Sequence, residues 1–140
     1  MSKNQSFENC LYHSANALSR VVTRIAEEEF KPTGLSPSAA FILVEVNAVN
    51  GIYIGDVSKK LQLSPSTITR LVEGLEKKEL VKREQKGKFT LLLPTKKSKS
   101  LTGKIINCWK NFEDKCDLLL GQKPKRKLLK KINATTIALD

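Results

Sequence analysis

The sequence predicts a mainly helical domain that contains a single β-hairpin. Apolar residues recur every three to four positions along most of the 140-residue chain, which is the period of a helix buried on one face. Between Leu80 and Leu93 the period shifts toward two, which is typical of strands. Two Ser-Pro pairs, at Ser36 and Ser64, each combine an N-cap residue with proline at the first helical position. These signals indicate several helices around one hairpin.

Three helices are expected in the first part of the chain. One apolar stripe begins at Phe7 and predicts a long helix that ends near Phe30, before the breaker sequence Lys-Pro-Thr-Gly. The second helix begins after Ser36 and is very apolar, so we expect it in the core. An Asn-Gly turn and a short amphipathic helix over about 56–61 follow.

The fourth helix has the clearest pattern in the sequence. It begins after Ser64, with an apolar set and a polar set on opposite faces. The polar set predicts a row of hydrogen-bonding groups facing solvent or a ligand. The inward positions are Ile68, Leu71, Val72 and Leu75, and the outward positions are Ser66, Thr69, Arg70 and Glu73.

A hairpin and two further helices complete the prediction. The strands, about 80–84 and 89–93, flank a basic tip that contains glycine. A long helix then runs to Gly121, and a basic last helix starts at Pro124. Its final residues, 134–140, are expected to fray or to pack on a neighbour.

Composition narrows the function. The chain has 25 Lys and Arg against 14 Asp and Glu, a net charge of +11. Residues 55–104 alone hold 13 basic and 5 acidic groups. A basic segment of this kind favours polyanionic partners, of which nucleic acid is the commonest.

Several classes of protein are disfavoured. A single histidine, no glycine-rich phosphate loop and no paired catalytic carboxylates argue against an enzyme, and no cofactor is expected. Cys10 and His13 supply only two ligands, so no metal site is expected. Three cysteines fit neither a disulfide framework nor a zinc motif, which indicates a reducing compartment. With short apolar runs and no secretory signal, we expect a cytoplasmic protein without membrane contact.

The order of elements between residues 54 and 93 suits duplex DNA. A short helix, a three-residue connection, an amphipathic helix and a basic hairpin make the order of a winged helix-turn-helix. Such a helix fits the major groove, and the hairpin tip reaches the backbone or the minor groove. Arg70 can pair bidentately with guanine or instead fork onto a phosphate. The predicted DNA-binding residues are Ser64, Ser66, Thr67, Thr69, Arg70, Lys82, Arg83, Lys86 and Lys88.

Residues 61–83, LQLSPSTITRLVEGLEKKELVKR, resemble the recognition-helix-to-wing signature of the multiple antibiotic resistance regulator (MarR) family. The resemblance implies one domain over 1–140, with a winged-helix core at about 36–95 and dimerisation helices at about 5–30 and 96–138. It also implies a cytoplasmic, homodimeric transcriptional regulator that binds a pseudo-palindromic operator. Family members often bind small effectors, so a small molecule is a further candidate partner.

The sequence departs from the family pattern at two places that matter here. Glu79 stands where the family usually has the glycine that ends the recognition helix. The hairpin is short and lacks the Asp-x-Arg stretch that usually sets an arginine into the minor groove. Lys86 and Lys88 are the cations at its tip. The usual wing contact is therefore not carried over to this chain.

Alternatives stay open for three features. Cys10 matches in position the peroxide-sensing cysteine of one branch of the family, and a redox-responsive regulator competes with a structural role for this thiol. A winged helix that works through protein contacts is the alternative to a DNA-binding protein. Four lysines at the start of the fifth helix either contact phosphates or are solvated: Lys96, Lys97, Lys99 and Lys104.

Overall fold

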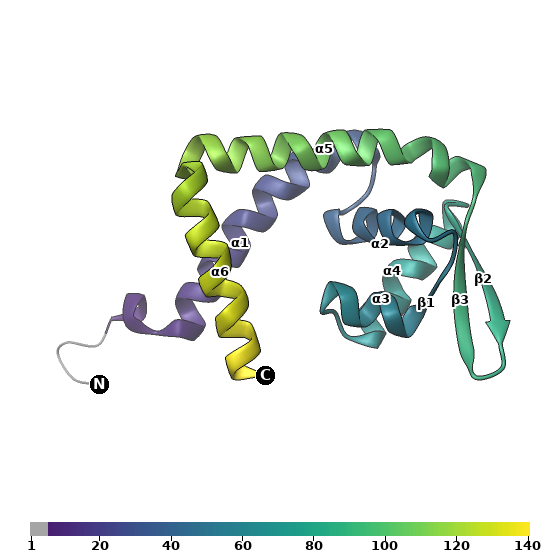
Figure 1. Cartoon of the computed structure of the whole chain (residues 1–140), viewed down its shortest axis with the longest axis horizontal. Coiled ribbons are helices and arrows are strands. Elements are labelled where there is room, and N and C mark those ends of the chain that lie inside the picture. The colour runs from purple at the N-terminus through teal and green to yellow at the C-terminus, as the bar shows by residue number, and fades with distance from the viewer. Residues whose placement is uncertain (1–5) are drawn as a thin grey trace.

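A computed structural model describes residues 6–140 and shows a mainly helical chain with one small antiparallel sheet. The long helix α5 runs along one side of the molecule and joins two lobes (Figure 1). Helix α6 turns back from the C-terminal end of α5, the C-terminal end of α1 contacts the middle of α5, and α2 to α4 with the sheet lie near its N-terminal end. In chain order the elements are η1 (Phe7–Asn9), α1 (Leu11–Phe30), η2 (Lys31–Thr33), α2 (Pro37–Ala48), β1 (Ile52–Tyr53), α3 (Ile54–Leu61), α4 (Pro65–Lys77), β2 (Val81–Lys86), β3 (Phe89–Pro94), α5 (Lys96–Leu120) and α6 (Gln122–Leu139).

Side-chain caps define where three of these helices begin. The Ser36 hydroxyl accepts a hydrogen bond from the Ala39 N–H at 3.3 Å, at the start of α2. Helix α5 begins with a capping box, in which Thr95 and Ser98 each accept a bond from the other's backbone N–H. These bonds satisfy donors that the first helical turn leaves without intrahelical partners. Both predicted Ser-Pro helix starts are confirmed.

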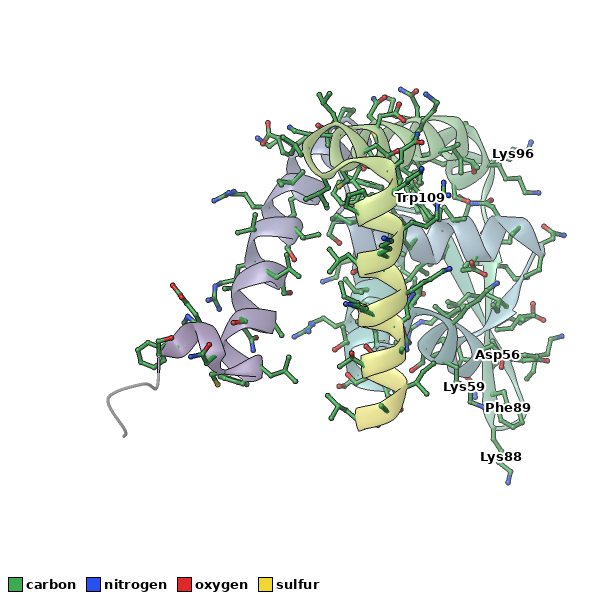
Figure 2. The ribbon with its side chains drawn as sticks, turned by 60° about the vertical axis from the view of Figure 1, so that its left-hand side comes forward. Asp56, Lys59, Lys88, Phe89, Lys96 and Trp109 are labelled. Atoms are coloured by element: carbon green, nitrogen blue, oxygen red, sulfur yellow. The ribbon has the colours of Figure 1, made fainter. Side chains whose placement is uncertain are left out.

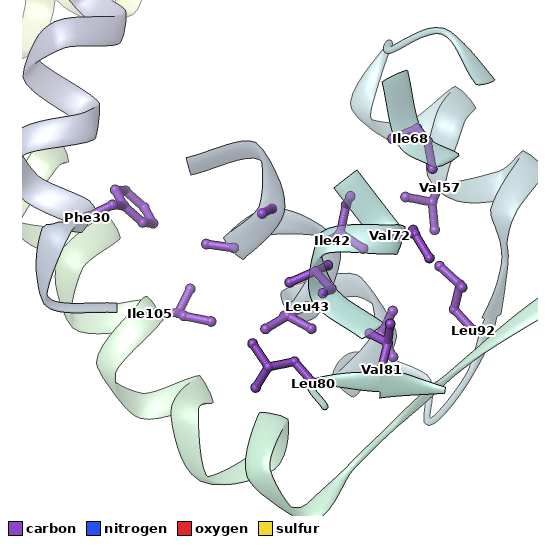
Figure 3. Close-up of a cluster of buried hydrophobic side chains, with 14 of the residues drawn as sticks. Phe30, Ile42, Leu43, Val57, Ile68, Val72, Leu80, Val81, Leu92 and Ile105 are labelled. Atoms are coloured by element: carbon purple, nitrogen blue, oxygen red, sulfur yellow. The ribbon is translucent and has the colours of Figure 1, made fainter. Parts of the chain in front are cut away.

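The buried core lies between α2, the helix-turn-helix, the sheet and α5 (Figure 3). Helix α2 supplies the largest share, because it is apolar on almost every face. Phe30, at the end of α1, packs edge-on against Phe41, and Phe41 in turn contacts Trp109 of α5. Among the largest fully buried side chains are Phe30, Ile42, Leu43, Val46, Val57, Ile68, Val72, Leu75, Leu92 and Ile105.

The predicted hairpin is present and gains a third strand. Strands β2 and β3 pair antiparallel from Val81 opposite Pro94 to Lys86 opposite Phe89. The two-residue strand β1 pairs with the other edge of β3, giving the order β1-β3-β2. Two residues are too few to show a periodicity in the sequence, so β1 was not predictable from pattern.

The predicted starts of the first and last helices are wrong. Helix α1 begins at Leu11, because residues 7–9 form a 3-10 turn and Cys10 is extended; residue 5, where the expected range began, lies outside the described residues. Helix α6 begins at Gln122 instead of Pro124, since proline is tolerated in a first turn whose N–H groups have no helical acceptors. The helix continues to Leu139, so of the two expectations for 134–140 fraying is wrong, and packing on a neighbour stays a prediction.

Candidate nucleic-acid interface

Helices α3 and α4 form a helix-turn-helix that is closed by polar contacts. Helix α3 ends at Gln62, which adopts the left-handed conformation (φ 54°). The Ser58 hydroxyl donates to the Leu63 carbonyl at 2.6 Å across the connection. The Ser64 hydroxyl then accepts from the Thr67 N–H at 3.2 Å and caps α4. The turn therefore holds the start of α4 in a fixed direction relative to α3.

The two faces of α4 are those that the sequence predicts. Ile68, Val72 and Leu75 are buried, and Leu71 is half-buried against the same core. On the other face Ser66, Arg70 and Glu73 are exposed, and Thr69 is half-buried. Within residues 6–140 the Arg70 guanidinium makes no salt bridge or hydrogen bond. Its five donors are thus available to an external acceptor.

Three hydroxyls gather at the N-terminal end of α4. The Ser64 oxygen lies 2.9 Å from the Thr67 hydroxyl and 3.2 Å from that of Ser66. Ser64 is therefore the helix cap, and Thr67 is half-buried beside it. Ser64 and Ser66 are both exposed, and within residues 6–140 only Ser64 of the two accepts a hydrogen bond from a backbone N–H.

The hairpin projects from the lobe and ends in a two-residue turn, Gly87-Lys88. Gly87 has a positive φ of 62°, and a glycine at the first central position of a two-residue turn is typical of the type II′ geometry that suits strand twist. Lys88 lies at the free end of the hairpin, far from Lys96 at its base (Figure 2). Lys82 lies near that base, where it lines a cleft with Lys96, Lys97 and Lys99.

Two of the predicted wing cations have carboxylate partners. Arg83 Nη2 lies 2.7 Å from Glu76 Oε1, so the base of the wing is tied to the last turn of α4. Lys86 Nζ lies 2.8 Å from Glu84 Oε1, and this hydrogen bond raises the pKa of Lys86. Lys88 has no ion-pair partner within residues 6–140. The Arg83–Glu76 pair depends on how the hairpin meets α4, so the sequence alone does not reveal it. Glu84 and Lys86 are two residues apart on one strand, a spacing that places both side chains on the same face.

The end of α4 accommodates Glu79 in the left-handed conformation, with a φ of 60°. The Leu80 N–H donates to the Leu75 carbonyl at 3.0 Å, and the Glu79 N–H donates to the Glu76 carbonyl at 2.9 Å. This pair of bonds is the Schellman motif, which usually places glycine at this position. Further bonds come from α5, where Thr95 Oγ1 donates to the Glu79 carbonyl at 2.9 Å. The helix therefore ends as in the family pattern, without its glycine.

The four ambiguous lysines lie at the start of α5, at the base of the hairpin. Lys97 Nζ donates to the Lys78 carbonyl at 2.9 Å, which fastens α5 to the end of α4. The other three, Lys96, Lys99 and Lys104, are exposed. Lys97 thus has a structural contact, and the choice between phosphate and solvent stays open for the others.

The three cysteines lie in different surroundings. Cys10 is exposed at the N-cap of α1, whereas Cys108 is buried and Cys116 is partly buried. Burial raises the pKa of the Cys108 and Cys116 thiols, which disfavours the reactive thiolate. Residues 6–140 contain no group of three or more His, Cys, Asp or Glu side chains that could hold one metal ion.

Helices α1 and α6 expose many apolar side chains. A groove of about 410 Å³ runs between them, with Leu11, Leu18, Ile132 and Leu139 in its walls. A second cleft, of about 780 Å³, separates the end of α6 from the α3–α4 connection. Among the helices in residues 6–140, none combines the length and the apolar character needed to cross a bilayer. The exposed apolar side chains of this region are Phe7 in η1, Leu11, Tyr12, Leu18, Val21 and Val22 in α1, and Leu128, Leu129, Ile132, Ile137 and Leu139 in α6.

The winged-helix lobe matches the model of a known protein family. The model of the MarR family matches residues 35–87, from the start of α2 to the tip of the hairpin. The winged-helix core is a MarR-family domain. This match confirms the resemblance in residues 61–83, and members of the MarR family are transcriptional regulators. No curated protein sequence matches the chain.

Solved structures of MarR-family regulators share the fold over nearly the whole chain. The MepR–DNA complex of S. aureus has a TM-score of 0.78 at 16% identity, covering 93% of this chain and 98% of that one. A mutant MarR from E. coli complexed with operator DNA has a TM-score of 0.80 at 14% identity, covering 96% and 99%. CouR from Rhodococcus jostii RHA1, bound to p-coumaroyl-CoA, has a TM-score of 0.74 at 18% identity, covering 97% and 95%. At such identities these likenesses establish the fold.

Proposed function

We propose that this MarR-family chain is a homodimeric transcriptional regulator that acts in the cytoplasm and reads a pseudo-palindromic operator. Helix α4, which starts after its cap Ser64, would enter the major groove, and the wing around Gly87 would reach the flanking DNA. The observation that carries the proposal is the exposed Arg70, which has no partner within residues 6–140 and projects from the polar face of α4. MepR and MarR, which share the fold, form complexes with DNA.

The chemistry of each side chain suggests which part of DNA it contacts. Arg70 presents a planar fork that matches two acceptors on guanine, whereas Ser66 and Thr69 are short and can make single bonds. Lys88 is a point charge suited to phosphate, and Lys86 is partly neutralised by Glu84. We therefore assign base discrimination to Arg70 and sequence-independent affinity to the lysines.

The homodimer rests on the exposed apolar faces of α1 and α6. Monomeric proteins rarely expose a continuous apolar surface of this extent, and a second copy related by a two-fold axis would bury it. The proposed organisation is one domain over 1–140, with dimerisation helices at about 5–30 and 96–138 around a core at about 36–95. Two copies would present two α4 helices to the two halves of the operator.

A small-molecule effector would fit between the lobes. The cleft between α6 and the α3–α4 connection borders Ser58, Lys59 and Gln62 on the winged side. A ligand there would contact both the dimerisation helices and the helix-turn-helix, so it could bias their relative position. CouR, bound to p-coumaroyl-CoA, is a regulator of this fold that binds such a ligand.

The test is binding to duplex DNA as a function of salt, followed by selection of bound sites from a random duplex pool. We expect affinity for random duplex to fall steeply with salt, as phosphate contacts require. On the selected operator, Arg70→Lys is expected to cost about 1 to 3 kcal/mol, with little loss on random DNA. Arg20→Lys on α1 is the matched control and should change neither. Equal losses on both DNAs would make Arg70 a phosphate clamp, and no loss on the operator would remove it from the interface.

The wing lysines give an independent test. Lys88→Ala should weaken binding to all sequences alike and lower the slope of log affinity against log salt by about one unit. Lys86→Ala should change the slope less, because Glu84 already neutralises part of its charge. Loss of preference at one base pair with an unchanged slope would show that the tip reads bases instead of phosphates.

A protein-interaction module is the second candidate function. The observation in its favour is that Arg83 and Lys86, two of the wing's cations, are paired with Glu76 and Glu84. Absence of salt-dependent binding to duplex DNA would support it. Redox sensing through Cys10 is a further possibility that rests on its exposed position at the start of α1. Peroxide treatment of the wild type and of Cys10→Ser should then release only the wild type from DNA.

A further inference from the structure

An aromatic pair lies exposed on the wing, outside the hydrophobic core. Phe89 is 64% exposed and Tyr53 is 40% exposed. Their ring centroids are 6.0 Å apart in an edge-on arrangement. Phe89 stands beside Lys88 at the free end of the hairpin (Figure 2). About two-thirds of the Phe89 side chain is therefore accessible to a partner at the hairpin tip.

The strand register places both rings on the outer face of the sheet. Leu92 is fully buried, and Phe89 is three positions away, so the two side chains point to opposite faces. Tyr53 pairs with Leu91, which shares the face of Phe89 two positions away. Tyr53 of β1 therefore lies on the same face of the sheet as Phe89 and contacts its ring. The edge-on contact limits the directions that the Phe89 ring can take.

Two lysines lie beside the exposed ring. Lys86 is directly across the strand pair from Phe89, and Lys88 precedes it in the turn. Lys86 is bonded to Glu84, but Lys88 has no ion-pair partner within residues 6–140. The hairpin tip thus combines an apolar ring with at least one available ammonium group. This combination fits a ligand that has an apolar interior and anionic edges.

We propose that Phe89 enters the minor groove of duplex DNA as an apolar wedge, with Lys88 on an adjacent phosphate and Tyr53 fixing the ring. The minor groove offers sugar surfaces and base-step edges between two rows of phosphates, and inserted apolar side chains partly unstack a base step there. Pyrimidine–purine steps are the easiest to unstack, so the wedge prefers sites with such a step under the wing. The inference rests on the proposed DNA-binding function and assigns a second residue, besides Arg70, to site selection.

The expected size of the effect follows from burial. Complete burial of a phenylalanine side chain, scaled to the two-thirds that is exposed here, corresponds to roughly a 5- to 30-fold change in affinity. Phenylalanine is uncharged, so its removal does not change the number of counterions released when the protein binds DNA. The slope of log affinity against log salt therefore stays unchanged. Substitution of a lysine at the tip, in contrast, should lower this slope. The two contributions of the wing can therefore be separated in one series of measurements.

The experiment measures affinity for the selected operator at several salt concentrations, for full-length wild type, Phe89→Ala and Val49→Ala. Val49 is a matched control, since it is 59% exposed and lies in the loop before β1. We expect Phe89→Ala to lose roughly 5- to 30-fold in affinity at an unchanged slope, and Val49→Ala to lose nothing. Phe89→Leu, which keeps an apolar but smaller side chain, should fall between wild type and Phe89→Ala. Replacing a pyrimidine–purine step under the wing by an A-tract should weaken wild type more than Phe89→Ala.

Three results would overturn the proposal. Unchanged affinity of Phe89→Ala would exclude the ring from the interface, and an altered slope would show that the substitution acts through the lysines. A change in the oligomeric state of Phe89→Ala relative to wild type, measured by sedimentation, would assign the aromatic pair to a protein contact. Thermal unfolding of each variant checks that the fold is intact. If wild type itself shows no salt-dependent binding to duplex DNA, the proposed function fails, and this outcome is distinct from the loss of the wedge alone.

Discussion

Replacing Glu79 by glycine is expected to stabilise the protein. Glu79 occupies the left-handed position after α4, with a φ of 60°. Its side chain makes no hydrogen bond or salt bridge within residues 6–140, so its removal breaks no contact. The hydrogen bonds of the helix end, from the N–H groups of Glu79 and Leu80, involve the backbone alone and persist in the variant.

The magnitude is a difference between two opposing terms. A non-glycine residue in the left-handed region costs about 1 to 2 kcal/mol, because Cβ approaches the carbonyl oxygen. Glycine adds conformational freedom to the unfolded chain, which offsets about 0.4 to 1 kcal/mol of that gain. The midpoints of these two ranges, about 1.5 and 0.7 kcal/mol, leave a net gain of about 0.8 kcal/mol in the free energy of unfolding. For a domain of this size that gain raises the Tm by about 3 °C.

Urea unfolding and thermal melting at one fixed protein concentration test this expectation, since the stability of the proposed dimer would depend on concentration. The control is Lys77→Gly, which puts glycine inside the last turn of the same helix and should destabilise by about 0.5 to 1 kcal/mol. A lower or unchanged stability of Glu79→Gly would refute the argument. It would mean either that the Glu79 side chain stabilises the folded state or that the left-handed backbone is not strained.

Three further predictions concern other parts of the molecule. Leu18→Glu puts a charge into the apolar groove between α1 and α6 and should give a monomer in analytical sedimentation, whereas an intact dimer would place the interface elsewhere. Ser64→Ala removes the cap of α4 and should lower the free energy of unfolding by about 1 kcal/mol, while Ser66→Ala should leave urea unfolding nearly unchanged. Lys125 links α6 to α5 through Glu113 and Asp117 at 2.7 and 2.6 Å, so Lys125→Met should increase hydrogen exchange along α6, and equal exchange in both proteins would show that the link is dispensable.

Most of the winged lobe could be predicted from local signals. The Ser-Pro caps at Ser36 and Ser64 mark helix starts by their own chemistry, and the apolar face of α4 is visible as a 3.6-residue period. The change of period after Leu80 identifies the hairpin, and its glycine marks the turn. These features depend on residues close together in the chain, which is why one sequence is enough to find them.

Contacts between distant residues were not predictable. The pairing of Arg83 with Glu76 depends on where the hairpin meets α4, and the contact of Tyr53 with Phe89 depends on a two-residue strand. The start of α6 at Gln122 was missed because proline was assigned the first helical position, although it is tolerated at the third as well. Ser64 was predicted to bind DNA, but its hydroxyl caps α4 by accepting a hydrogen bond from the Thr67 N–H. A polar residue at a helix start can therefore have a structural role that the sequence does not distinguish from ligand binding.

The end of α4, the base of the wing and the start of α5 are joined by Arg83–Glu76, Lys97 to the Lys78 carbonyl and Thr95 to the Glu79 carbonyl. These bonds fasten α4 and the wing, the proposed DNA-binding elements, to α5, whose 25 residues span about 37 Å. Such a helix is a lever, and a tilt of about 5° at one end displaces the other by roughly 3 Å. That displacement is close to the spacing of one base pair along DNA, about 3.4 Å. If α4 binds an operator half-site as proposed, small changes at the α1–α6 end of the molecule would therefore be large enough to shift it by about one base pair.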